Sequence, residues 1–305
     1  MLRRGWLVRS AVACSVFVGA SAGAQQPAAP ANVRTVDLDG HPVRVLVQGL
    51  EARPSGRPVV VFEAGGMQSL DVWADVLPQV STFAPIVAYD RAGLGQSEWD
   101  GESPTPQHVA RRLRTLLERV GAEPPYVLVG YSWGGILARY FAGLHPDDIA
   151  GIVYVDPGPI VTQSRAEMLA PFDSVGAGRA GYEAYWSGFA AFFARSPPAV
   201  RAEFDVFRGL MELDPAARDL RPEPRVPVVV LVAAKYQPLP PSMRLPFDPR
   251  AHFEVDARHR IGLMREWALA SPRGTLVVSN GTTHAIPRED PELIVWAVRR
   301  VLSGR

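Results

Sequence analysis

The sequence predicts an α/β protein built on a mostly parallel, doubly wound sheet. Short apolar runs such as residues 59–62 and 151–155 are typical of strands that are buried on both faces. Amphipathic stretches with helical spacing alternate with these runs, as at residues 106–120. This alternation favours a parallel sheet with helices on both faces. The 305 residues, 47% of them hydrophobic, suffice for a sizeable core.

Further elements are predicted in the same way along the chain. Residues 33–38 and 43–48 alternate apolar and polar side chains on either side of Asp39-Gly40, which predicts a β-hairpin. Buried strands are predicted at 59–62, 86–89 and 151–155, and further strands at 226–232 and 275–278. Helices are predicted at 70–80, 106–120, 257–269 and 291–302.

The alternation of strand and helix is interrupted between residues 159 and 224. This segment is rich in aromatic side chains and contains no strand-like run, and its periodicity predicts helices at 181–194 and 199–213. We therefore divide the chain into a core at 33–158 and 225–305 and a helical insertion at 159–224. An insertion of about 60 residues is long enough to be functional.

The N-terminal residues 1–24 have the pattern of an export signal. Basic residues begin the chain, an apolar run follows at 11–20, and Ala22-Gly23-Ala24 is a small-residue cleavage site. The run is too short to span a bilayer, so we expect no stable membrane anchor. We expect an exported protein that is located in a bacterial periplasm or outside the cell. Arg3-Arg4 leaves open whether export follows the general secretory or the twin-arginine route. Residues 25–32 are rich in proline and alanine and predict a disordered spacer.

Composition bounds the partners and cofactors. The net charge of +1 gives no reason to expect nucleic acid or an anionic membrane as a partner, so we expect a small-molecule substrate. The one cysteine lies within the export signal, and the sequence contains no Cys/His cluster, which predicts neither a disulfide nor a metal site. No phosphate-binding glycine loop follows the first strand, so no organic cofactor is expected. The oligomeric state is left open.

A serine near the middle of the chain lies in a strand–turn–helix context. Apolar residues 127–129 lead into Gly130-Tyr-Ser-Trp-Gly134, and a helical pattern follows at once. Gly-x-Ser-x-Gly in this setting is typical of a nucleophile elbow, where the serine takes a strained backbone conformation and only glycine fits beside it. The N-terminus of the following helix favours negative charge at the serine. We therefore predict that Ser132 is a catalytic nucleophile.

A second motif precedes the elbow and resembles a known family. Asp90-Arg-Ala-Gly-Leu-Gly-Gln-Ser97 follows a glycine-rich strand exit at Gly65-Gly66. Together with the elbow, these residues resemble the α/β-hydrolase superfamily, in particular its bacterial esterase-like, aminopeptidase-like and lactonase-like members. The resemblance implies the α/β-hydrolase fold, with residues 159–224 as a helical cap inserted after the strand that ends at Asp156. It also implies that the Asp90-Arg91 loop is an ion-paired structural turn.

The resemblance implies positions for the oxyanion donors and for the base. A tetrahedral intermediate needs two N–H donors. One is expected from Trp133, after the nucleophile, and the other from the glycine turn, where Gly66 is our first choice and Met67 the second. The base is expected late in the chain at the carboxyl end of a strand, which selects His284. We expect the other histidines on the surface.

The acid of the triad is ambiguous in the sequence. Most members of the superfamily carry an aspartate after the strand equivalent to residues 226–232, but here that loop reads Ala-Ala-Lys235-Tyr-Gln-Pro and contains no carboxylate. We predict that Asp156, at the end of the preceding strand, serves instead. An aspartate at such a turn often acts only as a helix cap. The alternatives are a later carboxylate that folds back, or a Ser-His dyad; the later carboxylates are Asp248, Glu254 and Asp256.

These residues predict a secreted serine hydrolase that cleaves a small-to-medium carboxylic ester through an acyl-enzyme. An aminopeptidase-like amide hydrolase would need an acidic cluster for the substrate amine, which Glu167, Glu183 and Glu203 leave open. A non-catalytic binding protein and a haloperoxidase-like or C–C bond hydrolase are further alternatives. A haloalkane or epoxide hydrolase is disfavoured, because those enzymes have a carboxylate in place of Ser132. We expect the substrate to contact Met67, Tyr131, Trp186 and Phe189.

Overall fold

The computed structural model describes residues 32–158, 162–240 and 243–304. The export signal predicted at 1–24 lies outside the described residues, as does the predicted spacer except for Asn32. Within the described ranges no helix is both long enough and apolar enough to cross a bilayer.

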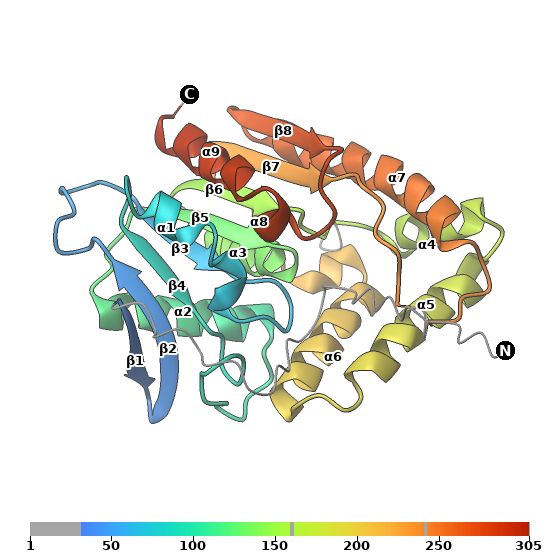
Figure 1. Cartoon of the computed structure of the whole chain (residues 1–305), viewed down its shortest axis with the longest axis horizontal. Helices are drawn as coiled ribbons and strands as arrows, with labels where there is room; N and C mark the ends of the chain where they lie inside the picture. Colours follow the sequence, from blue (N-terminus) through green and yellow to red (C-terminus); the bar gives the residue numbers. More distant parts are fainter. Residues whose placement is uncertain (1–31, 159–161, 241–242, 305) are drawn as a thin grey trace, which may run out of the picture.

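An eight-stranded sheet forms the centre of the described chain, in the order β1-β2-β4-β3-β5-β6-β7-β8 (Figure 1). The predicted hairpin is confirmed: β1 (Val33–Leu38) runs antiparallel to β2 (His41–Gln48), with Leu38 opposite His41. β2 is also antiparallel to β4, and all other neighbours are parallel. The remaining strands are β3 (Val59–Glu63), β4 (Ile86–Tyr89), β5 (Tyr126–Tyr131), β6 (Ile149–Val155), β7 (Val228–Ala233) and β8 (Gly274–Ser279).

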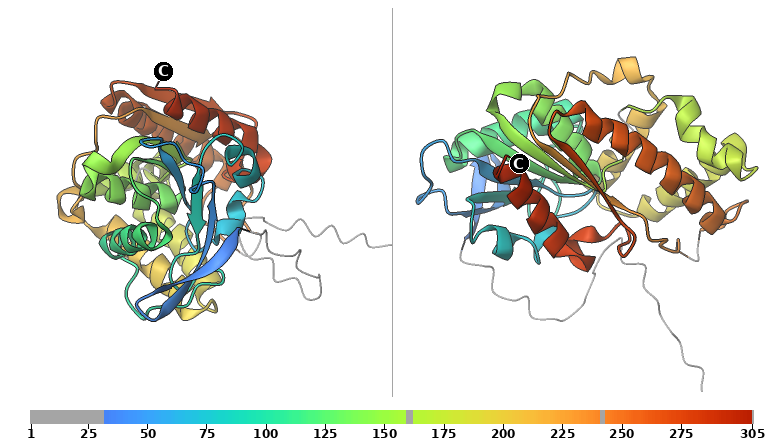
Figure 2. Two further views of the ribbon diagram at one scale, coloured as in Figure 1. Left: turned by 90° about the vertical axis from the view of Figure 1, so that its left-hand side faces the viewer. Right: turned by 90° about the horizontal axis from the view of Figure 1, so that it is seen from above.

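Helices cover both faces of the sheet and bury two hydrophobic clusters. One face packs against α2 (Pro106–Val120), α3 (Trp133–Leu144) and α7 (Pro249–Ala270). The other packs against η1 (Leu70–Trp73), α1 (Leu77–Val80), α8 (Ile286–Glu289) and α9 (Pro291–Leu302). Figure 2 shows α9 in dark red and α3 in green on opposite sides of the sheet. The predicted doubly wound architecture is therefore confirmed.

Between β6 and β7 the chain forms α4 (Arg165–Ser174), α5 (Gly178–Phe193) and α6 (Pro198–Glu212), which we call the cap. These helices lie on the right-hand side of Figure 1, with α5 and α6 below α4, away from α9. The sequence predicted helices close to α5 and α6 but not α4. α4 contains Pro171, a residue that disfavours a helix interior, and the apolar residues of α4 follow no helical stripe, so periodicity gave no signal.

Two predicted helices differ from the structure. The helix predicted at 70–80 consists of η1 and the single turn α1. Pro78 has no N–H to donate to the preceding turn, so it fits at the start of α1 but not inside one continuous helix. The helix predicted at 257–269 begins earlier, at Pro249, where Asp248 accepts a hydrogen bond from the N–H of Arg250. Short 3₁₀ turns at Pro146–Asp148 and Pro215–Arg218 complete the described elements.

Candidate active site

The nucleophile elbow has the close backbone approach that its sequence predicted. Ser132 lies between β5 and α3 with a φ of +53°, in the left-handed region that non-glycine residues rarely occupy. A Cβ at Gly134 would lie 2.3 Å from the carbonyl oxygens of Glu63 and Ala64, and one at Gly130 only 2.5 Å from the carbonyl oxygen of Gly134. A side chain at Gly134 would push α3 away from the end of β3, and one at Gly130 would push the start of α3 away from β5. The glycines therefore permit the turn that exposes the serine hydroxyl.

Ser132, His284 and Asp156 form one hydrogen-bonded chain. His284 Nε2 lies 3.0 Å from Ser132 Oγ, and His284 Nδ1 lies 2.6 Å from Asp156 Oδ2. The Asp156 side chain is 1% exposed, whereas the His284 side chain is 38% exposed and therefore open to a substrate. In this arrangement the imidazole can take the serine proton at Nε2, while the carboxylate orients the ring and stabilises the imidazolium that forms.

The order of the strands explains why these residues meet. β6 is the neighbour of β5 in the sheet, so Asp156, directly after β6, is beside Ser132, directly after β5. Main-chain bonds hold both positions: Ser132 N–H donates to Val155 O at 2.9 Å, and Asp156 N–H donates to Leu231 O at 2.8 Å. His284 arrives from the loop after β8, and Tyr131 donates its hydroxyl to the His284 carbonyl at 2.8 Å.

The second carboxylate oxygen of Asp156 is held by Arg260, a residue that the sequence analysis did not single out. Arg260 Nη1 lies 2.5 Å from Asp156 Oδ1, which also accepts the N–H of Ala233 at 2.9 Å. Arg260 Nη2 donates to the Ala233 carbonyl at 2.9 Å. Burial alone would raise the pKa of Asp156, but the Arg260 charge and the His284 hydrogen bond bring this pKa below its ordinary value of 3.8. Asp156 is therefore held as a carboxylate.

The other candidate acids lie away from the imidazole Nδ1 atom. Asp248 caps the N-terminus of α7, and Glu254 pairs with Arg250 on the exposed side of that helix. Asp256 pairs with Arg260, at 3.8 Å from Nε. Only Asp156, of the carboxylates that the sequence left open, is hydrogen-bonded to His284 among the described residues.

The candidate oxyanion donors differ in whether their backbone N–H already has a hydrogen-bond partner. Gly66, Met67, Trp133 and Ser132 line a hollow of about 80 Å³ beside the serine. The N–H of Met67 donates to the carboxylate of Glu203 from α6 and is therefore occupied. For the N–H groups of Gly66 and Trp133, no partner is found in the described part of the chain. This geometry favours Gly66 over Met67 as the donor that pairs with Trp133.

Glu203 belongs to a buried ion cluster that joins the cap to the core. Arg91 donates to Glu203 through Nε at 2.6 Å and Nη2 at 3.0 Å, and to Glu63 through Nη1 at 2.8 Å. Arg91 also donates to the carbonyls of Ala64 and Gly65 in the glycine turn. Burial raises the pKa of Glu63, and the Arg91 charge and the Tyr89 hydroxyl only partly offset this. The Asp90-Arg91 turn is ion-paired as expected, and through Glu203 it also fixes the turn that carries Gly66.

A large apolar cavity opens onto Ser132 and His284. Its volume is about 360 Å³, and it lies between the cap and the carboxyl ends of the strands. Three of the residues expected to contact the substrate line it: Met67, Trp186 and Phe189. Tyr131 lines the smaller hollow instead, with its ring 5.0 Å from that of His284. The other aromatic lining residues are Tyr185, Phe192, Phe193, Phe204, Phe207 and Phe253.

The expectation that every other histidine lies on the surface is wrong for His252. Its residue is 8% exposed, and its ring lies 4.1 Å from that of Phe172 and 5.9 Å from that of Tyr185, between α7 and the cap. Burial lowers the pKa of His252. The prediction failed because α7 begins earlier than expected, and the extra turns place this residue against aromatic side chains of α4 and α5.

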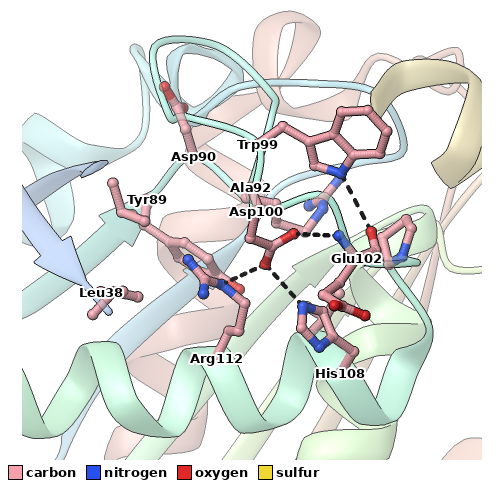
Figure 3. A pocket seen from close by; sticks show the side chains of 13 residues that line it. Leu38, Tyr89, Asp90, Ala92, Trp99, Asp100, Glu102, His108 and Arg112 are labelled. Atoms are coloured by element: carbon pink, nitrogen blue, oxygen red, sulfur yellow. Dashed lines mark hydrogen bonds and ion pairs between the residues drawn. The ribbon is translucent and has the colours of Figure 1, made fainter. Parts of the chain in front are cut away.

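A small hollow that is not lined by Ser132 is closed by its own ion pairs (Figure 3). Asp100 accepts from His108 Nε2 at 2.9 Å and lies 3.1 Å from Arg112 Nε, and the hollow has a volume of only about 20 Å³. It therefore has room for little more than a water molecule. Over the described ranges no group of three or more His, Cys, Asp or Glu side chains is arranged to hold a metal ion.

Comparison with known proteins agrees with this architecture. The family described as alpha/beta hydrolase fold matches residues 58–285. The Bacillus subtilis protein YqjL is 33% identical over 98 residues, covering 32% of this chain and 39% of YqjL. The Mycobacterium tuberculosis lipase LipV is 32% identical over 160 residues, covering 50% of this chain and 58% of LipV. The matched part of the chain thus spans less than two thirds of the length of these relatives.

The solved structures extend the likeness to nearly the whole fold. A putative epoxide hydrolase from Pseudomonas aeruginosa has a TM-score of 0.63 at 18% identity, covering 92% of this chain and 98% of that protein. Cfl2 from Burkholderia cenocepacia has a TM-score of 0.61 at 22% identity, covering 90% of this chain and 95% of Cfl2. At these identities the likeness concerns the fold alone. With the family match across most of its length, this chain belongs to the α/β-hydrolase fold family.

Proposed function

We propose that this protein is a serine hydrolase that cleaves a carboxylic ester through an acyl-enzyme on Ser132. The observation that carries the proposal is the continuous chain of hydrogen bonds from Ser132 Oγ through both ring nitrogens of His284 to Asp156. A serine hydroxyl is a weak nucleophile alone, and a base at 3.0 Å that is oriented by a carboxylate is the arrangement that activates it.

Each step of the reaction has a group placed for it. Ser132 Oγ attacks the ester carbonyl while His284 Nε2 accepts the serine proton, and the resulting oxyanion receives the N–H groups of Gly66 and Trp133. The tetrahedral intermediate collapses, the C–O bond to the alcohol breaks, and His284 returns the proton to the leaving oxygen. Water then attacks the acyl-enzyme with His284 again as base, which releases the acid and restores Ser132.

The partners of the cap glutamates favour an ester over an aminoacyl amide. Recognition of a substrate ammonium needs a carboxylate that faces the cavity and is otherwise unpaired. Glu203 is bound by Arg91 and Met67, Glu183 pairs with Arg165 and Arg179, and Glu167 forms a capping box with Ser164. None of these glutamates lines the cavity. The aromatic walls instead suit an apolar acyl or alcohol group.

Similar proteins include a haloalkane dehalogenase and a putative epoxide hydrolase, and Ser132 argues against both of these activities for this chain. Attack of a hydroxyl on an alkyl halide or an epoxide would leave an ether on Ser132. Water does not cleave an unactivated ether, so the enzyme would stop after one turnover. An acyl ester on the same oxygen is hydrolysed readily, which makes a carbonyl the fitting electrophile.

We further propose that the protein is exported, on the strength of the signal pattern at residues 1–24. Expression of the full chain in a Gram-negative host, followed by fractionation and N-terminal sequencing, tests this. A periplasmic product that begins at Gln25 is expected. A cytoplasmic product that retains Met1 would contradict it.

A substrate panel tests the proposed chemistry. Purified protein is assayed with 4-nitrophenyl esters of increasing acyl length and with aminoacyl 4-nitroanilides, and the Ser132→Ala variant serves as the control. We expect ester hydrolysis that disappears in the variant, with kcat/KM rising with acyl length as the apolar cavity fills. Anilide cleavage faster than ester cleavage would replace the esterase by the amidase, and a wild type no more active than the variant would refute both.

A further inference from the structure

We propose that the ester cleaved by this protein carries an anionic group, and that Lys235 binds that group at the wall of the cavity. The substrate class is an ester with an apolar body and a carboxylate, such as a monoester of a dicarboxylic acid. This inference rests on the proposed function, because it concerns the cavity that opens onto Ser132.

Lys235 is one of the cavity-lining residues, and it is also exposed to solvent. It follows β7, and its backbone is tied to the loop that carries the base: Lys235 N–H donates to Thr282 O at 3.1 Å, two residues before His284. Ala234 N–H donates to Ser279 O at 2.8 Å and holds the same segment against the end of β8. The point at which the lysine side chain begins is therefore fixed relative to the reacting groups.

The other charged groups of the cavity wall, two carboxylates and one guanidinium, are ion-paired with one another. Arg260 bonds Asp156 and pairs with Asp256, so these three side chains form one connected network. For the ammonium of Lys235, no ion-pair partner is found in the described part of the chain. A substrate therefore meets one cation whose charge is not already satisfied by a neighbouring carboxylate.

The surroundings strengthen the attraction between this cation and an anion. The aromatic side chains of α5 and α6 exclude water from the body of the cavity when a substrate fills it. Lys235 is exposed, so an ion pair there is shielded from water on the cavity side only, and is stronger than one in bulk water to that extent. An ammonium acts as a point charge and imposes no planar bidentate geometry, so it tolerates an anion at the end of a flexible chain. The same charge repels a substrate ammonium, in agreement with the proposed preference for esters over aminoacyl amides.

A matched pair of substrates tests the inference. 4-Nitrophenyl octanoate and the mono-4-nitrophenyl ester of octanedioic acid share the leaving group and the chain length and differ in the terminal carboxylate. The readout is the ratio of their kcat/KM values, anionic over neutral. Lys235→Met should lower this ratio about fivefold, the size expected of one partly solvated ion pair, and Lys235→Glu should lower it further. Lys235→Arg should keep the ratio, because it keeps the charge.

Arg258→Met is the matched control, since it removes an exposed cation of α7 that does not line the cavity. This variant should leave the ratio at the wild-type value, which separates a local ion pair from the net charge of the protein. The wild-type ratio should also fall as salt is raised. A ratio that is the same in Lys235→Met and wild type would overturn the inference, even if the neutral ester is hydrolysed and the proposed function stands.

A binding measurement makes the inference independent of turnover. Octanedioic acid monoamide is titrated into the Ser132→Ala protein and into Ser132→Ala with Lys235→Met, and the two dissociation constants are compared by calorimetry. Weaker binding without the lysine charge supports the proposed site. Equal binding in the two proteins, or tighter binding without the lysine, contradicts it.

Discussion

Replacement of Asp156 by Asn tests two separate functions of this carboxylate. His284 Nδ1 would lose the anion at 2.6 Å that orients the ring, and Arg260 would lose the charged partner of its Nη1. The first loss should lower kcat by about 10⁴-fold, because the imidazole is no longer held in the tautomer that accepts the serine proton. The second loss should lower the free energy of unfolding, because it leaves a cation without its counter-ion.

The size of the stability effect follows from the burial of the pair. The Asp156 side chain is 1% exposed and that of Arg260 is 15% exposed. Breaking a fully buried pair costs about 3–5 kcal/mol. Arg260 keeps the Ala233 carbonyl, the Asp256 charge and some contact with water, so we expect about 2 kcal/mol here.

The double variant Asp156→Asn with Arg260→Met separates stability from catalysis. It removes both charges, so its free energy of unfolding in urea should return toward the wild-type value. Its kcat for a 4-nitrophenyl ester should stay near that of Asp156→Asn, because the orienting carboxylate is still absent. A kcat within tenfold of wild type in either variant would refute this account and point to Asp256, on the same cavity wall, or to a Ser-His dyad.

Three further predictions concern the cap, the elbow and the pH dependence of stability. Glu203→Gln leaves the buried Arg91 with one charged partner fewer, so the turn that carries Gly66 loses part of its support. This variant should lower kcat more than it raises KM. Unchanged kinetics would contradict this prediction. Gly134→Ala forces a methyl group against the backbone of β3 and should lower the free energy of unfolding by about 2–3 kcal/mol and abolish turnover, measured by urea unfolding and ester assay. The lowered pKa of Asp156 means that its stabilising effect is complete above about pH 3.8 and is lost as the pH falls through its folded value. The difference in unfolding free energy between the wild type and Asp156→Asn should therefore shrink below pH 3.8, and a constant difference there would contradict the pKa shift.

The sequence predicted the features that local sterics and strand patterns determine. The elbow at Ser132 follows from glycine spacing within five residues, and the parallel sheet follows from short apolar runs between helices. His284 could be selected because it alone follows a late strand. The acid could not be selected in this way, because Asp156, Asp248 and Asp256 all come after Ser132, and only the adjacency of β5 and β6 separates them.

The features that the sequence missed depend on contacts between distant segments. Arg260 reaches Asp156 across 104 positions, and no local pattern marks it among the other arginines of α7. From the sequence, Glu203 could be interpreted as a residue that binds a substrate amine. In the structure α6 packs on the glycine turn, so the Glu203 carboxylate accepts hydrogen bonds from Arg91 and from the N–H of Met67. Tertiary packing rather than residue type decided both roles.

The central claim is that Ser132 is an activated nucleophile, and covalent labelling tests it most directly. The folded protein is treated with a fluorophosphonate, and the modified residue is located by peptide mass spectrometry in the wild type and in Ser132→Ala. We predict a single adduct on Ser132 in the wild type and none in the variant. A folded wild type that stays unlabelled, or an adduct that persists in Ser132→Ala, would contradict the claim.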